Sequence, residues 1–135
     1  MTLVASLHSG ATLPLGAVVL SLAVACQAVP SAHSSASDKI AFDLSTLDEN
    51  GLYGSPGGKR SLDYEFCIPN GDAYAQAVGA IDPSTRFFPQ SRGRIGCGEN
   101  EVLAIGNTNQ PDYDTILIEL ANLDYIDRIQ PMDWE

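Results

Sequence analysis

Charged side chains are missing from the first 37 residues of the chain, where no Asp, Glu, Lys or Arg occurs. All 17 acidic and 7 basic side chains lie from Asp38 onward, so this part carries the whole net charge of -10. A surface this acidic repels nucleic-acid phosphates and anionic lipid headgroups. We therefore expect no nucleic-acid partner and no polybasic membrane anchor, whereas cationic partners and divalent ions stay possible.

Histidine is scarce as well, because His8 and His33 both precede the charged part of the chain. No Ser-His-Asp or Cys-His catalytic group can form within that part without borrowing from the segment before it. Two cysteines without a histidine are too few for a four-ligand zinc site, and the acidic clusters lack the spacing of a calcium-binding loop. The glycine-rich stretches 54–60 and 93–98 do not fit phosphate-binding patterns. We expect no catalytic residue, metal site or cofactor, and predict that the protein is not an enzyme.

The uncharged N-terminal part contains an apolar run, residues 15–25, that is too short for a helix spanning a bilayer. It ends in the small residues Ala23 and Ala25, which suit cleavage by a signal peptidase. We predict a signal peptide over residues 1–25. The cysteine that follows, Cys26, resembles the lipobox cysteine of bacterial lipoproteins, which implies that it receives a lipid and holds the protein at a membrane.

Residues 26–40 contain mostly small and polar side chains and are predicted to form a flexible tether between Cys26 and the folded domain. The lipid is then the only membrane contact, at the periplasmic or thylakoid-lumenal face. Ordinary secretion, with cleavage at the same site or after Ala28, is the alternative, and a leader retained in the cytoplasm is a further one.

The cysteine count agrees with export. Cys26 stands where lipid would be attached, and the remaining two cysteines, Cys67 and Cys97, can pair with each other. We predict that they form a disulfide in an oxidising compartment. Two separate buried thiols are one alternative. A reactive Cys97 thiol, activated by Arg92 and Arg94, is another.

Residues 41–135 are predicted to form one α+β domain. Residues 62–68 alternate strictly between apolar and polar side chains, as in a strand. The pattern then predicts a helix capped by Asn70 and ending at Ile81, a hairpin of strands 94–97 and 101–105, a helix starting at Pro111, and a last strand 126–132 in which Pro131 indicates an edge. A short helical turn is expected within residues 42–51.

This order of elements predicts a ferredoxin-like βαββαβ sandwich. The prediction conflicts with the predicted disulfide, because the third strand of such a sheet lies between the first and the second. Two strand spacings are about 9.6 Å, whereas a disulfide joins Cα atoms no more than about 7 Å apart. Either the two cysteines lie on loop ends that curl together, or one of the two assignments is wrong.

A long loop after the first helix is the candidate partner-binding site. It contains the only concentration of basic residues, interleaved with aromatic ones: Arg86, Phe87, Phe88, Arg92 and Arg94. Long loops often bind partners. Alternatively, the phenylalanines cover the sheet edge and the arginines pair with surface acids.

Several motifs resemble a family of small cyanobacterial exported proteins of unknown function. They are FDL at 42–44, LDENGLYG at 47–54, YEFCIP at 64–69, GRIGCG at 93–98 and IGNTNQP at 105–111. The resemblance covers residues 41–135 and implies a photosynthetic bacterial host and an exported location, but no catalytic residue. A weaker resemblance in layout, and in LDYIDRIQP at 123–131, links the chain to the ferredoxin-like propeptide inhibitors of subtilisin-type proteases.

The sequence therefore predicts a non-catalytic binding or accessory module at a membrane surface outside the cytoplasm, with a protein partner of unknown identity. The sequence does not indicate which oligomeric state the protein has. A propeptide-type protease inhibitor and a thiol-dependent enzyme are the two alternatives.

Overall fold

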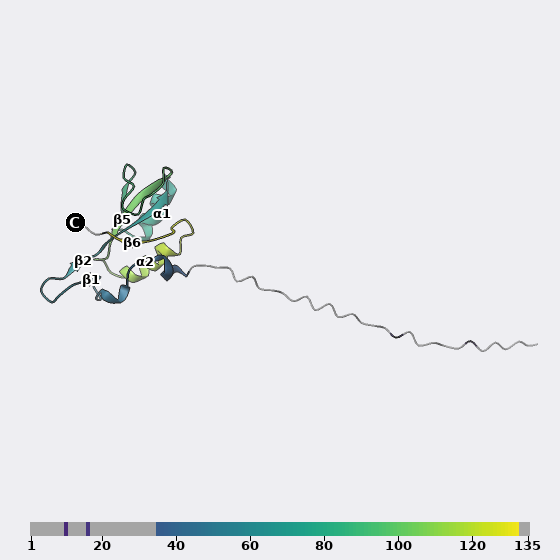
Figure 1. Cartoon of the computed structure of the whole chain (residues 1–135), viewed down its shortest axis with the longest axis horizontal. Helices are drawn as coiled ribbons and strands as arrows, with labels where there is room; N and C mark the ends of the chain where they lie inside the picture. The colour runs from purple at the N-terminus through teal and green to yellow at the C-terminus, as the bar shows by residue number, and fades with distance from the viewer. Residues whose placement is uncertain (1–9, 11–15, 17–34, 133–135) are drawn as a thin grey trace, which may run out of the picture. The chain divides into compact units, whose positions relative to one another are not determined.

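The computed structural model describes residues 10, 16 and 35–132, and the secondary structure lies within the last of these ranges. Four strands form the main sheet and two α-helices pack on it, while a separate pair of short strands forms a hairpin (Figure 1). In chain order the elements are the 3-10 helices η1 (Ala36–Lys39) and η2 (Leu44–Thr46), β1 (Leu52–Tyr53), β2 (Arg60–Ser61), β3 (Asp63–Pro69), α1 (Asp72–Ile81), β4 (Arg86–Phe88), β5 (Glu101–Asn107), α2 (Tyr113–Ala121) and β6 (Gln130–Pro131). The predicted α+β class is confirmed.

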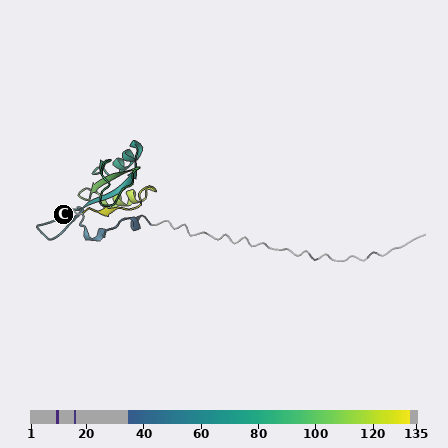
Figure 2. The ribbon, with the colours of Figure 1, turned by 45° about the horizontal axis from the view of Figure 1, so that its top comes forward.

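The main sheet is antiparallel throughout, in the order β4-β5-β3-β6. Its centre is the seven-residue pairing of β3 with β5, in which Asp63 lies opposite Asn107 and Pro69 lies opposite Glu101. The hairpin of β1 and β2 projects away from this sheet in both views (Figure 1 and Figure 2). Strand β6 is an edge strand, as Pro131 predicts, because proline has no N–H to donate to a further strand.

One face of the sheet carries the helices and the main core. Alternate residues of β3 point to this face, and Tyr64, Phe66 and Ile68 are at most 1 % exposed. They pack in one cluster with side chains of both helices, among them Val78, Leu117 and Leu120. Each such apolar side chain contributes about 1.5–3 kcal/mol when fully buried. The strict alternation of β3 is therefore the pattern that places the core.

The other face, called the outer face below, has a smaller apolar cluster. Cys97, Leu103 and Ile105 are buried there, and Cys67, Ile95 and Met132 pack against them. Both described α-helices pack with the main core, and this second cluster is covered by residues 91–98, the loop that follows β4. We call these residues the covering loop.

The predicted second strand, residues 94–97, is wrong: these residues are turns of the covering loop, and the strand that precedes β5 is β4. Gly93 and Gly96 have φ of 64° and 81°, in the left-handed region that a strand cannot use. The correction removes the conflict with the disulfide, because Cys97 lies on a loop above the sheet and not on a strand within it.

The helix boundaries differ slightly from the prediction. The N-cap residue of α1 is Gly71 and not Asn70, and α2 begins at Tyr113, two residues after Pro111. The last strand is confined to Gln130–Pro131. The short helical turn expected within residues 42–51 is η2, where the Asp43 side chain accepts a hydrogen bond from the Ser45 N–H.

Residues 35–40, assigned to the tether, pack against the domain. Ala36 and Ile40 contact the main core. Ile40 forms a parallel bridge with Ile129, in which the Ala41 N–H donates to the Ile129 carbonyl and the Ile129 N–H donates to the Lys39 carbonyl, both at 2.8 Å. The folded part of the chain therefore includes these residues.

Candidate functional site

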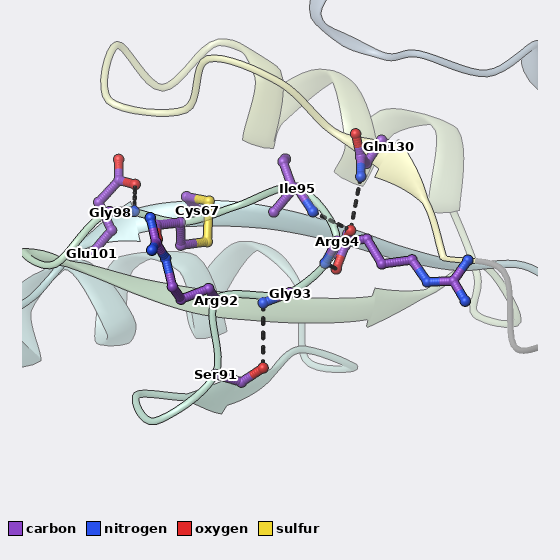
Figure 3. The surroundings of a disulfide bond; sticks show 11 residues. Cys67, Ser91, Arg92, Gly93, Arg94, Ile95, Gly98, Glu101 and Gln130 are labelled. Carbon is purple, nitrogen blue, oxygen red and sulfur yellow. Dashed lines mark hydrogen bonds between the residues drawn. A yellow bond between two sulfur atoms is a disulfide. The ribbon is translucent and has the colours of Figure 1, made fainter.

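A disulfide fixes the covering loop to the centre of the sheet. Cys67 on β3 and Cys97 in the loop are bonded, with their Cα atoms 5.5 Å apart (Figure 3). The predicted pairing is confirmed. Cys97 is 1 % exposed, whereas Cys67 is partly accessible. In this oxidised form neither sulfur is available as a nucleophilic thiolate.

A buried carboxylate holds the same loop at a second point. Glu65 lies two residues before Cys67 on the outer face and is completely buried. Its Oε1 atom accepts hydrogen bonds from the Ile95 N–H at 2.7 Å and from Gln130 Nε2 at 2.8 Å, and its Oε2 atom accepts one from the Arg94 N–H at 3.3 Å. Figure 3 shows Gln130 on β6 and Ile95 in the loop converging on this point. Glu65 therefore joins the loop to the edge strand.

The covering loop is also closed by bonds of its own. The Arg92 carbonyl accepts from the Gly96 and Cys97 N–H groups at 3.1 and 2.8 Å, and Arg92 Nε donates to the Cys97 carbonyl at 2.8 Å. A Cβ atom on Gly93 would collide with Glu65 Oε2 and with Leu103, so only glycine fits there. The loop is thus held by covalent, side-chain and backbone links at once.

Four of the five residues proposed for partner binding are exposed around this loop. Arg86 and Phe88 pair with Ile105 and Leu103, and directly opposite residues share a face, so both lie on the outer face. Phe88 is 38 % exposed. Arg92 and Arg94 are exposed in the loop itself, Arg92 beside the disulfide and Arg94 extending to the opposite side (Figure 3).

The fifth residue, Phe87, does not belong to this surface. It pairs with Ala104 and packs against the main core on the helix side. The alternative that the phenylalanines cover the sheet therefore holds for Phe87 but not for Phe88. Strand alternation explains the difference, since neighbouring residues of a strand point to opposite faces.

Among residues 35–132, no acidic side chain forms an ion pair with an arginine of the outer face. Within residues 35–132, the one ion pair shorter than 4.0 Å joins Lys59 Nζ to Asp48 Oδ2. Arg128, which is exposed, adds a further guanidinium to this side because it lines a groove beside the disulfide. That groove has a volume of about 250 Å³ and is lined by Cys67, Ile95, Gly96, Glu101, Asp127 and Arg128.

Comparisons of the chain with known proteins give no relative. No family model, curated protein or solved structure matches it. The site must therefore be interpreted from its own chemistry.

A second buried carboxylate, Asp82, lies on the helix side and is structural. It accepts hydrogen bonds from Tyr64 Oη at 2.6 Å, from the Ser84 N–H and Oγ at 2.9 and 2.6 Å, from Thr85 Oγ1 at 2.7 Å and from Gln110 Nε2 at 2.9 Å. Burial raises its pKa, but the hydrogen bonds outweigh burial and leave the pKa below the ordinary 3.8. Burial and the Asp82 charge raise the pKa of Tyr64. Neither group is poised for proton transfer near neutral pH.

Three acidic residues from the clusters at 48–50, 99–101 and 112–114 have structural positions. Asp48 pairs with Lys59 at 2.7 Å, and this hydrogen bond holds the pKa of Asp48 below its ordinary value. Glu101 Oε2 accepts from the Gly98 N–H at 2.6 Å, and Asp112 is the N-cap residue of α2. None of the buried side-chain nitrogen or oxygen atoms in the described part of the chain lacks a hydrogen-bond partner.

Two predicted features lie outside the described residues: the signal peptide over residues 1–25 and the lipid-accepting Cys26. Among the described helices, none has the length and hydropathy needed to cross a membrane.

Sequence reasoning did not single out Glu65 or Asp82. The available signal for Glu65 was its position, two residues from Cys67 on the same face of an alternating strand.

Proposed function

We propose that the protein is a non-catalytic binding module, exported and held at a membrane surface by a lipid on Cys26, and that its outer face binds a partner segment rich in carboxylates. One observation carries the proposal. The chain has five arginines, and four of them, all but Arg60, lie on or beside the outer face of a protein whose net charge is -10.

The chemistry of these arginines supports an acidic partner. A guanidinium presents a planar fork of donors that matches a carboxylate in two hydrogen bonds. Arg86, Arg94 and Arg128 form no ion pair within the described residues, so their donors face solvent. Phe88, exposed between them and the sheet edge, offers the aromatic contact that often anchors such an interface.

The rigidity of the covering loop supports binding as well. A loop that is already held in one conformation loses little conformational entropy when a partner binds. The disulfide and the Glu65 carboxylate hold this loop through Cys97 and through the backbone N–H groups of Arg94 and Ile95. The guanidinium group of Arg94 takes no part in these links, whereas that of Arg92 also donates to the Cys97 carbonyl.

We also propose that the domain is ferredoxin-like. The strand order β4-β5-β3-β6, the antiparallel pairing and the packing of α1 and α2 in one core with β3 support a βαββαβ arrangement. The proposed export is supported by the disulfide, since such bonds persist in oxidising compartments such as the periplasm. Release as a soluble secreted protein is the alternative to the lipid anchor.

A peptide-binding experiment tests the outer face. A glutamate-rich peptide is titrated into the isotopically labelled chain, and the amide NMR shifts are followed at low salt. We expect shifts concentrated at Arg86, Phe88 and the covering loop, which weaken as salt is added because exposed charges are screened. A lysine-rich peptide serves as the opposite-charge control and should leave these amides unchanged.

Paired variants give the matching control. Arg86→Glu together with Arg94→Glu should abolish the shifts, whereas Arg60→Glu should not, because Arg60 lies 5.1 Å from the Tyr53 ring centroid in the separate hairpin. Equal losses in both proteins would mean that only overall charge matters, and the proposed surface would be wrong. Mass spectrometry of the N-terminus isolated from membranes tests the lipid on Cys26 separately, and a free thiol or an uncleaved leader would contradict it.

A further inference from the structure

The outer face brings together three side chains that can ligate a metal. Cys67 and Glu101 lie at neighbouring outer positions of β3 and β5, and the covering loop adds Cys97. One donor atom from each of the three, two sulfurs and a carboxylate oxygen, lies within 4.8 Å of the other two. The sequence did not indicate this group, because Cys67 is 34 residues before Glu101 along the chain and no histidine accompanies the three residues.

We infer that the reduced form of the protein binds one Zn²⁺ ion through Cys67, Cys97 and Glu101. Two thiolates and a carboxylate are ligands that zinc accepts, at about 2.3 Å for sulfur and 2.0–2.2 Å for oxygen. Zinc sites with three protein ligands leave the fourth position to water or another small ligand. The exclusion of zinc from the sequence assumed four protein ligands and does not apply to such a site. This inference concerns a site within the chain and does not rest on the proposed partner.

We expect the ligands to stay close together when the disulfide is reduced, because other contacts hold the covering loop. Glu65 binds the Arg94 and Ile95 N–H groups, and the Arg92 carbonyl binds the Cys97 N–H, so the covering loop remains attached to the sheet. Glu101 is oriented by the Gly98 N–H, which belongs to the residue after Cys97. Oε2 accepts this bond, and no hydrogen bond between described residues uses Oε1.

The groove beside the disulfide gives the ion access. Cys67 and Glu101 both line it, so the open position would face about 250 Å³ of solvent-connected space. Asp127, which is exposed and lines the same groove, is not one of the three grouped ligands. It is therefore the natural control residue.

The reduction and the binding step balance as follows. A dithiol reductant supplies two electrons and two protons, the Cys67–Cys97 bond breaks to give two thiols, and the reductant becomes a disulfide. Zn²⁺ then displaces the two thiol protons, and both are released to solvent. On reoxidation, a disulfide oxidant accepts two electrons from the two thiolates and two protons from solvent and becomes a dithiol, while the Cys67–Cys97 bond re-forms and the ion is released.

Cobalt and zinc binding test the site in the full chain carrying Cys26→Ser, so that only the two domain cysteines are present. After reduction and removal of the reductant without oxygen, Co²⁺ should produce thiolate-to-metal absorption that saturates at one ion per chain. Zn²⁺ should displace it and should raise the melting temperature of the reduced protein but not of the oxidised protein. If the reduced chain shows no thiolate absorption, or if zinc does not raise its melting temperature, the inference is wrong.

Two carboxylate variants separate this site from metal binding by cysteines alone. Glu101→Gln keeps an oxygen for the Gly98 N–H and leaves both cysteines, and it should weaken Zn²⁺ binding by at least about 10-fold, whereas Asp127→Asn should bind zinc as the parent does. Equal affinity of the Glu101→Gln protein and the parent would overturn the three-ligand site. Both variants retain the disulfide in the oxidised state, so their folding can be verified before reduction.

Discussion

Removing the disulfide gives the sharpest test of how the outer face is held together. The change is Cys67→Ala combined with Cys97→Ala, which leaves no buried hydroxyl in place of the sulfur. The bond spans a sequence separation of 30. The entropy of closing a loop of this length corresponds to about 3.6 kcal/mol of stability at 25 °C.

Urea unfolding followed by circular dichroism measures this loss as a lower midpoint with nearly unchanged slope. In thermal unfolding we expect a melting temperature roughly 14–29 °C lower, given about 4–8 °C per kcal/mol for a domain of this size. Cys26→Ser is the control and should leave both midpoints unchanged.

The same variant tests the second attachment of the covering loop. If Glu65 holds the loop independently, the Ile95 amide stays protected from hydrogen exchange in the folded variant, because its bond to Glu65 remains. A stability loss below 1 kcal/mol would refute the reasoning about the unfolded chain. Rapid exchange at Ile95 would refute the role of Glu65.

Three further predictions concern single residues. Glu65→Gln replaces the carboxylate that accepts three hydrogen bonds in the parent protein with an amide, so it should lower the free energy of unfolding by about 1–3 kcal/mol. An unchanged midpoint in urea unfolding would contradict this prediction. Because folding lowers the pKa of Asp82, its carboxylate should stabilise the fold above pH 3.8 and lose this effect as the pH falls through the folded-state pKa. The stability of Asp82→Asn should therefore depend less on pH in this acid range. Identical profiles of stability against pH for the variant and the parent would disprove the prediction. Gly51→Ala should destabilise the protein by more than about 1 kcal/mol, because the added Cβ would collide with the Thr108 carbonyl. Gly79→Ala is the control: its Cβ would lie in open space within α1, so it should stabilise by up to about 1 kcal/mol. Equal urea midpoints for the two proteins would refute the collision.

Local patterns in the sequence were sufficient to predict the centre of the fold. Alternation over residues 62–68 predicted β3 and which of its side chains enter the main core, and Pro131 predicted an edge strand. Counting cysteines predicted the pair Cys67 and Cys97. These features depend on neighbouring residues in the chain or on the number of cysteines, so they could be predicted without knowledge of tertiary contacts.

The features that sequence analysis missed depend on contacts across the fold. Residues 94–97 resemble a short strand until the positive φ angles of Gly93 and Gly96 are known. In the sequence, Glu65 and Glu101 look like ordinary surface acids. The covering loop makes Glu65 a buried hydrogen-bond acceptor and places Cys97 beside Glu101 and Cys67. Likewise, the strand register alone separates the exposed Phe88 from Phe87, which is partly buried against the main core.

The contacts of residues 35–41 determine where a mechanical load would act on the domain. Tension applied ahead of Ser35 reaches the fold first at η1, where Ala36 packs against the core and Lys39 Nζ donates to the Leu123 carbonyl, and then at the bridge between Ile40 and Ile129. We expect these contacts to break first, since few hydrogen bonds hold residues 35–41 to the rest of the domain. The disulfide joins the covering loop to β3 and not to this segment, so the outer face would keep its shape while residues 35–40 detach.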